Sequence, residues 1–215
     1  DGSTTNDSTL ILTFTSSEVT TNFSIDDITV SGGVITDFNS ISSTVYTVIL
    51  TPSEEGTITI NINSGVYTDA ANNSNADATE FNWTYNSTNP IMTITASNSI
   101  NAVSNGTVGN DDNLIITFTS SKATSDFTEQ DIDISGGTLS NFNVTSNTVY
   151  TVTMTPDDEG LITLDVVANS FTDVLGNNNS GATQFTWTYD NTAPTMSITS
   201  TNGNESVVDG STTND

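Results

Sequence analysis

The stretch TVYTV at residues 44–48 returns unchanged at residues 148–152, 104 positions further along the chain. Sliding the sequence against itself by that distance aligns it without a gap, so the chain contains a tandem duplication. In both copies, hydrophobic residues around this stretch stand at every second position, which is the pattern of strands with one buried face. Helical spacing is nowhere sustained, and the sequence therefore predicts an all-β protein.

The second copy carries seven such segments, each bounded by Gly, Asn, Asp, Ser or Pro, the residues that end strands. They lie near residues 91–97, 114–119, 131–135, 138–142, 149–155, 161–167 and 183–189. Seven short strands in about 100 residues is the count of an immunoglobulin-like sandwich. We expect tandem immunoglobulin-like seven-stranded β-sandwiches in an elongated array, meeting at a small interface around residues 86–91.

Module boundaries follow from the recurrence of the first strand. The segment IMTIT at residues 91–95 follows one proline, and TMSIT at residues 195–199 follows another. Each such strand belongs to the module that comes after it. We therefore assign residues 1–89 to an Ig-like module that lacks its own first strand, residues 90–193 to a complete module, and residues 194–215 to the first strand and loop of the next module.

The recurring strand at residues 195–199 leads to a specific expectation. Met196 and Ile198 should not fold back on the second module, but should complete the first module of the next copy beside Leu10, Leu12 and Phe14. Covalent continuity of a longer chain and exchange of a strand between separate subunits both remain open as the cause. The heptad DGSTTND, at residues 1–7 and again at 209–215, indicates a parent repeat of 208 residues.

The charge balance is one-sided. Asp and Glu number 26, and the only basic residue is Lys122, so the formal net charge is −25. Salt, bound divalent cations or an extended shape must relieve the resulting self-repulsion. Nucleic acid is a poor partner for such a chain, and no hydrophobic run approaches the ~20 residues that a membrane span needs. Because position 18 in the first copy is Glu18, we interpret Lys122 as a surface charge.

Catalytic chemistry finds no support in the residue types. The chain has no Cys and no His, which excludes disulfides, zinc sites, thiol nucleophiles and imidazole bases. The adjacent carboxylates in the turns at residues 52–56 and 156–160 lack the apolar pocket that would raise one pKa for glycoside hydrolysis. Trp83 and Trp187 alternate with other aromatic residues, which predicts a packed core rather than a carbohydrate platform. We expect no enzyme and assign no catalytic residue.

The whole-length pattern carries a family resemblance. It resembles the bacterial Ig-like repeats of giant surface adhesins and biofilm-associated proteins, and the resemblance implies a secreted, multi-copy stalk that is often stiffened by calcium. The residues that carry it in the second copy are Phe127, Asp131, Ile132, Ser135, Gly136, Gly137, Phe142, Tyr150, Thr155, Pro156, Gly160, Phe171, Thr172, Asp173, Gly176, Asn177, Phe185, Trp187, Tyr189, Asp190 and Pro194.

Calcium is the one cofactor that the sequence suggests. Calcium takes six to eight oxygen ligands, and the loops supply carboxylates, amides and carbonyls in abundance. Loops at one pole of the second sandwich could converge with the linker, while the alternative is that Asp and Asn here only form turns and keep the chain soluble. The candidate ligands are Asp173, Asn177, Asp190, Asp111, Asp112 and, in the first copy, Asp69.

Nine Asn-x-Ser/Thr sequons occur, about the number expected by chance in a chain so rich in Asn, Ser and Thr. The candidate glycosylation sites are Asn86, Asn105 and Asn82.

We expect a structural repeat module of a long extracellular stalk, adhesin or filament, which gives extension and attachment at the cell surface or in a biofilm. Its partners would be neighbouring copies of the same repeat, joined end to end. The alternatives are a module that binds a glycan or a host surface and a filament subunit that exchanges strands.

Overall fold

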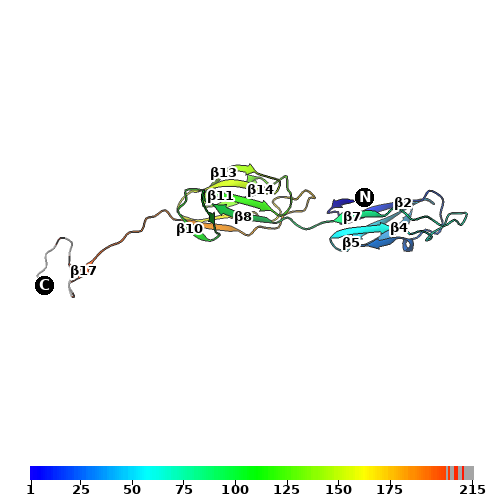
Figure 1. The fold of residues 1–215 in the computed structure, drawn as a ribbon, viewed down its shortest axis with the longest axis horizontal. Coiled ribbons are helices and arrows are strands. Elements are labelled where there is room, and N and C mark those ends of the chain that lie inside the picture. Colours follow the sequence, from blue (N-terminus) through cyan, green and yellow to red (C-terminus); the bar gives the residue numbers. More distant parts are fainter. Residues whose placement is uncertain (202, 204–205, 208–209, 211–215) are drawn as a thin grey trace.

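The computed structural model describes residues 1–201, 203, 206, 207 and 210. They form two β-sandwiches that follow one another along a single axis, so the molecule is elongated (Figure 1). The prediction of an all-β protein built from two tandem sandwiches is therefore confirmed. In the part of the chain that the structure describes, no helix has the length and the hydrophobicity needed to cross a membrane.

The first module consists of a four-stranded and a three-stranded sheet. In the four-stranded sheet the order is β1 (Ser3–Thr5), β7 (Phe81–Tyr85), β6 (Gly56–Asn61) and β3 (Thr29–Ser31). In the three-stranded sheet the order is β2 (Leu10–Thr15), β5 (Val45–Pro52) and β4 (Gly33–Ser40). A single 3₁₀ turn, η1 (Ile25–Asp27), precedes β3.

The second module repeats this plan and adds two strands to the second sheet. Its first sheet has the order β10 (Thr107–Gly109), β16 (Phe185–Tyr189), β15 (Gly160–Asp165) and β12 (Asp133–Ser135). Its second sheet has the order β13 (Gly137–Val144), β14 (Val149–Pro156), β11 (Leu114–Ser120), β8 (Met92–Ser97) and β9 (Ala102–Val103).

The expected count of seven strands is too low for the second module, which has nine in residues 90–193, all of them described. The two strands that the sequence did not predict are β9 and β10. They have only two and three residues, too few to show an alternating pattern. The strand expected from residue 131 begins at Asp133 instead. Before it, the Asp131 carboxylate accepts a 2.7 Å hydrogen bond from the Thr128 N–H and closes the 3₁₀ turn η2 (Glu129–Asp131).

The core of each module lies between its two sheets, where the alternating side chains meet. Trp83 and Trp187 are each 1% exposed, and the Trp83 indole N–H donates to the Thr5 hydroxyl at 3.1 Å. The prediction that these aromatic residues belong to the core is confirmed. Tyr46 and Tyr150 are also buried, and each uses its hydroxyl to bridge backbone carbonyl groups at one end of its module.

The first module is less closed than the second. Among the strands that the structure describes, β2 pairs only with β5, whereas the equivalent β11 pairs with both β14 and β8. Leu114, Ile116 and Phe118 on β11 are completely buried, but their counterparts on β2 are only half-buried. A groove of about 960 Å³ runs along β2 at this place.

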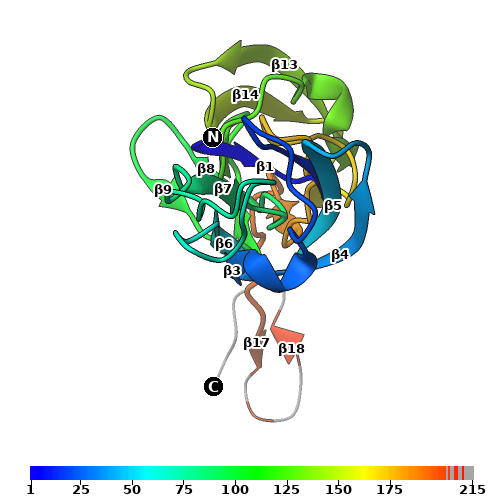
Figure 2. The ribbon, with the colours of Figure 1, turned by 90° about the vertical axis from the view of Figure 1, so that its right-hand side faces the viewer.

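Beyond β16 the chain leaves the second module on the side away from the first one and ends in a two-stranded hairpin, β17 (Ser200–Thr201) and β18 (Ser206–Val207) (Figures 1 and 2). Met196 and Ile198 are both 90% exposed, so the expectation that they do not fold back is confirmed. Residues 195–199 do not form the expected strand, because no strand in the described part of the chain pairs with them. The second copy of the heptad DGSTTND lies outside the described residues except for Gly210.

Candidate functional site

The junction between the modules is built around the linker at residues 86–91, which connects β7 to β8. On the side of the first module, Glu55 in the turn between β5 and β6 holds this linker. One oxygen of its carboxylate accepts hydrogen bonds from the Ser87 N–H at 2.9 Å and the Ser87 hydroxyl at 3.1 Å, and the other accepts the Thr88 hydroxyl. The Thr88 and Ser87 hydrogen bonds outweigh partial desolvation and lower the pKa of Glu55.

On the side of the second module, backbone contacts anchor the end of the linker. Ile91 donates its N–H to the Ser121 hydroxyl at 2.9 Å, and the Ser121 N–H donates to the Ile91 carbonyl at 2.9 Å. The Ser180 N–H donates to the Pro90 carbonyl at 2.9 Å. The last residues of the linker are thus fixed to the second module before β8 begins.

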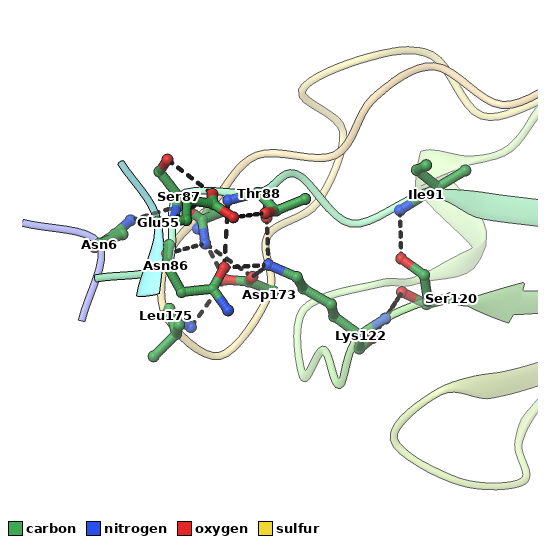
Figure 3. A network of polar contacts seen from close by, with 12 residues as sticks. Asn6, Glu55, Asn86, Ser87, Thr88, Ile91, Ser120, Lys122, Asp173 and Leu175 are labelled. Carbon is green, nitrogen blue, oxygen red and sulfur yellow. Dashed lines mark hydrogen bonds and ion pairs between the residues drawn. The ribbon is translucent and has the colours of Figure 1, made fainter. Parts of the chain in front are cut away.

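Lys122 connects the second module to the middle of the linker (Figure 3). It follows β11, and its ammonium group donates to the Asn86 side-chain oxygen at 2.8 Å and to the Thr88 carbonyl. The same ammonium nitrogen lies 3.3 Å from Oδ2 of Asp173. The interpretation of Lys122 as a surface charge is wrong, because its side chain is only 23% exposed and its charged end is enclosed by the linker and the Asp173 loop.

Asp173 is buried and organises its own loop. One carboxylate oxygen accepts the backbone N–H groups of Leu175 and Asn177 at 2.9 Å each, and the other accepts the Asn177 side-chain amide at 3.0 Å. Burial acts to raise the pKa of Asp173, but the hydrogen bonds from Asn177, Leu175 and Lys122 outweigh it, and the pKa is lowered. The carboxylate therefore stays ionised opposite the ammonium group.

Asn177 of the second module is hydrogen-bonded both to the linker and to the first module. Its side-chain amide donates to the Asn86 carbonyl at 3.1 Å, while its side-chain oxygen accepts the Asn6 amide of the first module at 3.1 Å. Among the described residues, no buried side-chain nitrogen or oxygen lacks a hydrogen-bond partner. A short linker bonded at both ends and in the middle restricts rotation of one module against the other, which is what this arrangement can do physically.

The structure brings together only some of the candidate calcium ligands. Asp173 and Asn177 share one loop at the junction, where the Lys122 ammonium already neutralises the carboxylate. Asp190 lies at the opposite end of the second module, where its N–H donates to the Gly109 carbonyl at 2.9 Å. The expected convergence of Asp173 with Asp190 inside one module is therefore not found.

The remaining candidates do not lie with Asp173 either. Asp111 accepts the Asn98 amide at 3.1 Å, and Asp112 contacts Tyr189, so both lie at the Asp190 end of the module. Asp69 accepts the N–H and the side-chain amide of Asn73, both at 2.8 Å, in the first module. No three acidic side chains gather into a metal-binding group anywhere in the described part of the chain.

The candidate glycosylation sites differ in their surroundings. Asn86 is half-buried in the junction, and Asn82 is half-buried on β7. Asn105 is exposed, but its amide donates to the Gln184 carbonyl at 3.0 Å and its oxygen accepts the Thr186 N–H at 2.8 Å. Glycosylation of all three stays a prediction.

Sequence reasoning missed the junction residues Glu55, Lys122 and Asn6. Two signals were available: Lys122 is the only cation of the chain, and Glu55 recurs in the second copy as Glu159. Asn6 gave no signal, because its partner is 171 residues away in the sequence.

A protein-family model described as a bacterial Ig-like domain matches residues 1–85 and 86–189. A search of curated proteins finds no match. Among solved structures, Yersinia pseudotuberculosis InvD aligns with 92% of this chain at 15% identity and a TM-score of 0.38. A second is SGBP-B of the Bacteroides ovatus mixed-linkage glucan utilization locus, in complex with a mixed-linkage heptasaccharide, which aligns with 87% of this chain at 20% identity and a TM-score of 0.24. The chain covers 59% of the first structure and 42% of the second.

Proposed function

Because the chain belongs to the bacterial Ig-like domain family, whose members are typically non-catalytic structural modules, we propose that it is a repeat module of a long extracellular stalk, adhesin or filament. In this role it holds the functional end of a larger protein at a distance and contributes to attachment at the cell surface or in a biofilm. The observation that carries the proposal is the hydrogen-bonded linker. Lys122 of the second module donates to Asn86 and Thr88, which directly follow the last strand of the first module.

The charge of the chain supports an extended role. A formal charge of −25 with one Lys produces repulsion between neighbouring modules, and this repulsion is smallest when the modules are far apart along a line. Glu55 and Lys122 oppose bending at the joint, since a bend must break hydrogen bonds on one of the two sides. Both the hydrogen bonds at the junction and the electrostatic repulsion between the modules therefore favour an extended molecule.

Backbone ¹⁵N relaxation combined with small-angle X-ray scattering tests this function. We expect both modules to report one anisotropic tumbling time and the scattering to give an elongated rod. The variant Lys122→Gln should loosen the joint, whereas Glu18→Gln, at the equivalent position of the first module, should leave it unchanged. Independent tumbling of the two wild-type modules would contradict a stiff stalk, and saturable binding to a glycan array would favour a binding module instead.

Calcium, the cofactor suggested by the sequence, stays a proposal. The oxygen-rich loops and the shortage of cations support it. A cation that binds only the folded chain must raise the melting temperature. We expect such a rise on addition of millimolar calcium to metal-free protein, and no change would overturn the proposal.

A further inference from the structure

The free edge of β2 in the first module is the strongest unexplained feature of the molecule. β2 pairs with β5 on one side, and no described strand pairs with its other side. In the second module the same side of β11 is covered by β8 over six residue pairs. An uncovered edge presents backbone donors and acceptors that can take up a further strand.

The groove beside this edge has an apolar floor. In the second module the β8 side chains Met92 and Ala96 are buried over the equivalent floor, and Ile94 packs against it. Without such a strand, side chains of the first module stay half-buried where their counterparts are at most 2% exposed. The half-buried residues are Leu10, Leu12, Phe14, Tyr67 and Phe81, and their counterparts are Leu114, Ile116, Phe118, Phe171 and Phe185.

The chain itself carries a segment of the right sequence. Residues 196–201 read MSITST, and the β8 strand at residues 92–97 reads MTITAS. Met196 and Ile198 correspond to Met92 and Ile94, the side chains that point into the core from β8. Both are 90% exposed in this segment, so two large apolar side chains lack any core of their own.

This segment already has the backbone surroundings of β8. The hairpin of β17 and β18 pairs Ser200 with Val207, and β8 and β9 pair the equivalent Ala96 with Val103. The segment is therefore presented with the same neighbouring strand that β8 has in the finished module.

The exit from the second module is also arranged like the exit from the first. The Glu159 carboxylate accepts the Asn191 N–H at 2.8 Å and the Thr192 hydroxyl at 2.8 Å, as Glu55 does for Ser87 and Thr88. The segment after β16, residues 190–201, is called the tail. It thus leaves the second module in the way that the linker leaves the first.

The tail cannot reach the groove of its own chain. The six steps from Asp190 to Met196 span at most about 21 Å in a fully extended backbone. One eight-residue strand of the second module is already about 26 Å long. The groove lies in the first module, beyond the whole second module and the junction (Figure 1), so the tail does not fill the groove of its own 215-residue chain.

We propose that residues 196–201 of one copy insert into the groove of a second copy as an antiparallel strand beside β2. The register of β8 on β11, transferred to β2, places Ile198 opposite Phe14, Ser200 opposite Leu12 and Ser197 opposite Thr15. Met196 and Ile198 then enter the groove, and Ser197 and Thr199 face solvent. Each copy gives its tail and receives one, so copies join head to tail into a linear filament. This assembly does not depend on the stalk role or on the stiffness of the internal junction.

Sedimentation velocity on the full 215-residue chain tests the proposal first. We expect linear oligomers that grow with protein concentration, in steps of the 22.6 kDa chain. Ile198→Asp should abolish them, because it places a charge in the groove, and it cannot damage the fold because the side chain is exposed in the single chain. Thr199→Asp is the matched control on the solvent-facing side and should assemble like the wild type. A chain that stays monomeric at several hundred micromolar, or an Ile198→Asp variant that assembles normally, overturns the proposal.

The register is tested by engineered disulfides, because the chain has no cysteine of its own. Thr15→Cys combined with Ser197→Cys should give a ladder of covalent oligomers on a non-reducing gel, since these positions face each other across the proposed pair. Thr119→Cys combined with Ser197→Cys is the control, because Thr119 is the counterpart of Thr15 and its edge is already covered by Thr93 of β8. Equal ladders from both pairs would show random collision and overturn the register, and absence of both would overturn the insertion.

Discussion

The ammonium nitrogen of Lys122 lies 3.3 Å from Oδ2 of Asp173, whose side chain is only 1% exposed. This pair places the single basic residue of the chain against a buried carboxylate at the end of the second module. Because the same ammonium group also bonds to Asn86 and Thr88, the charge pair and the linker form one network. The stability of the second module and the geometry of the junction are therefore coupled.

Lys122→Gln should destabilise the second module by about 2 kcal/mol. Loss of one partner of a fully buried pair costs roughly 3–5 kcal/mol, and the partial exposure of the Lys122 side chain reduces this. Urea unfolding followed by the fluorescence of Trp187, in a Trp83→Phe background, measures the change. Glu18→Gln in the same background is the control, and a loss of equal size in that variant would contradict a special role for Lys122.

Acidification should weaken the second module through Asp173. Its pKa is lowered in the folded chain relative to the ordinary value of 3.8, so its contribution to stability is present above that value and is lost as the pH falls through the folded pKa. We expect Asp173→Asn to be less stable than the wild type at pH 7 and to lose less stability between pH 5 and pH 2. Urea unfolding of both proteins across this range provides the measurement, and parallel pH profiles would contradict the prediction.

The first module should be less stable than the second by about 2–4 kcal/mol. It lacks the burial of a large apolar side chain equivalent to Met92 and the partial burial of one equivalent to Ile94, at roughly 1.5–3 kcal/mol for each fully buried side chain. Amide hydrogen exchange on the Ile198→Asp variant compares β2 with β11 directly. We expect β2 to exchange faster, and a peptide covering residues 194–201 should slow it. Equal protection of the two strands without the peptide would show that the open edge has no energetic consequence.

Association between copies should strengthen as salt is added. In the proposed contact between two copies, Glu18 occupies the position that Lys122 has in the internal junction, and Asp190 occupies the position of Asn86. Two negative charges therefore face each other there. Salt screens this repulsion over a Debye length of about 10 Å at 0.1 M. Sedimentation equilibrium between 0.02 M and 0.5 M NaCl should show a rising association constant.

Reversal of the charge at position 18 is a second test of the proposed contact between copies. Glu18→Lys should increase the association constant at low salt at least tenfold and flatten its salt dependence, because it supplies the ammonium group that Lys122 provides internally. Glu54→Lys makes the same change in net charge in the β5–β6 turn and is the control. An equal gain in both variants would assign the effect to net charge rather than to the contact.

Much of the fold could be predicted from the sequence, because alternation is a local property. The period of two around Tyr46 and Tyr150 shows which side chains face inward, and the duplication gives two modules of one design. The short strands β9 and β10 were not predictable in this way, since they exist only through pairing with β8 and β16. The site was harder to predict from the sequence. Lys122 was interpreted as a surface charge, because its partner Asp173 is 51 residues away and neither residue belongs to a local pattern.

By itself, the sequence determined the all-β architecture, the tandem modules and the separation of residues 195–199 from the module before them. These follow from periodicity and from identity between repeats, which need no knowledge of distant contacts. Only the tertiary structure decided that Lys122, Asp173 and Asn177 meet at the junction, and that β2 has an open edge beside a groove. The physical reason is that hydrogen bonds and charge pairs between loops depend on where whole sheets come to lie, which local alternation does not specify.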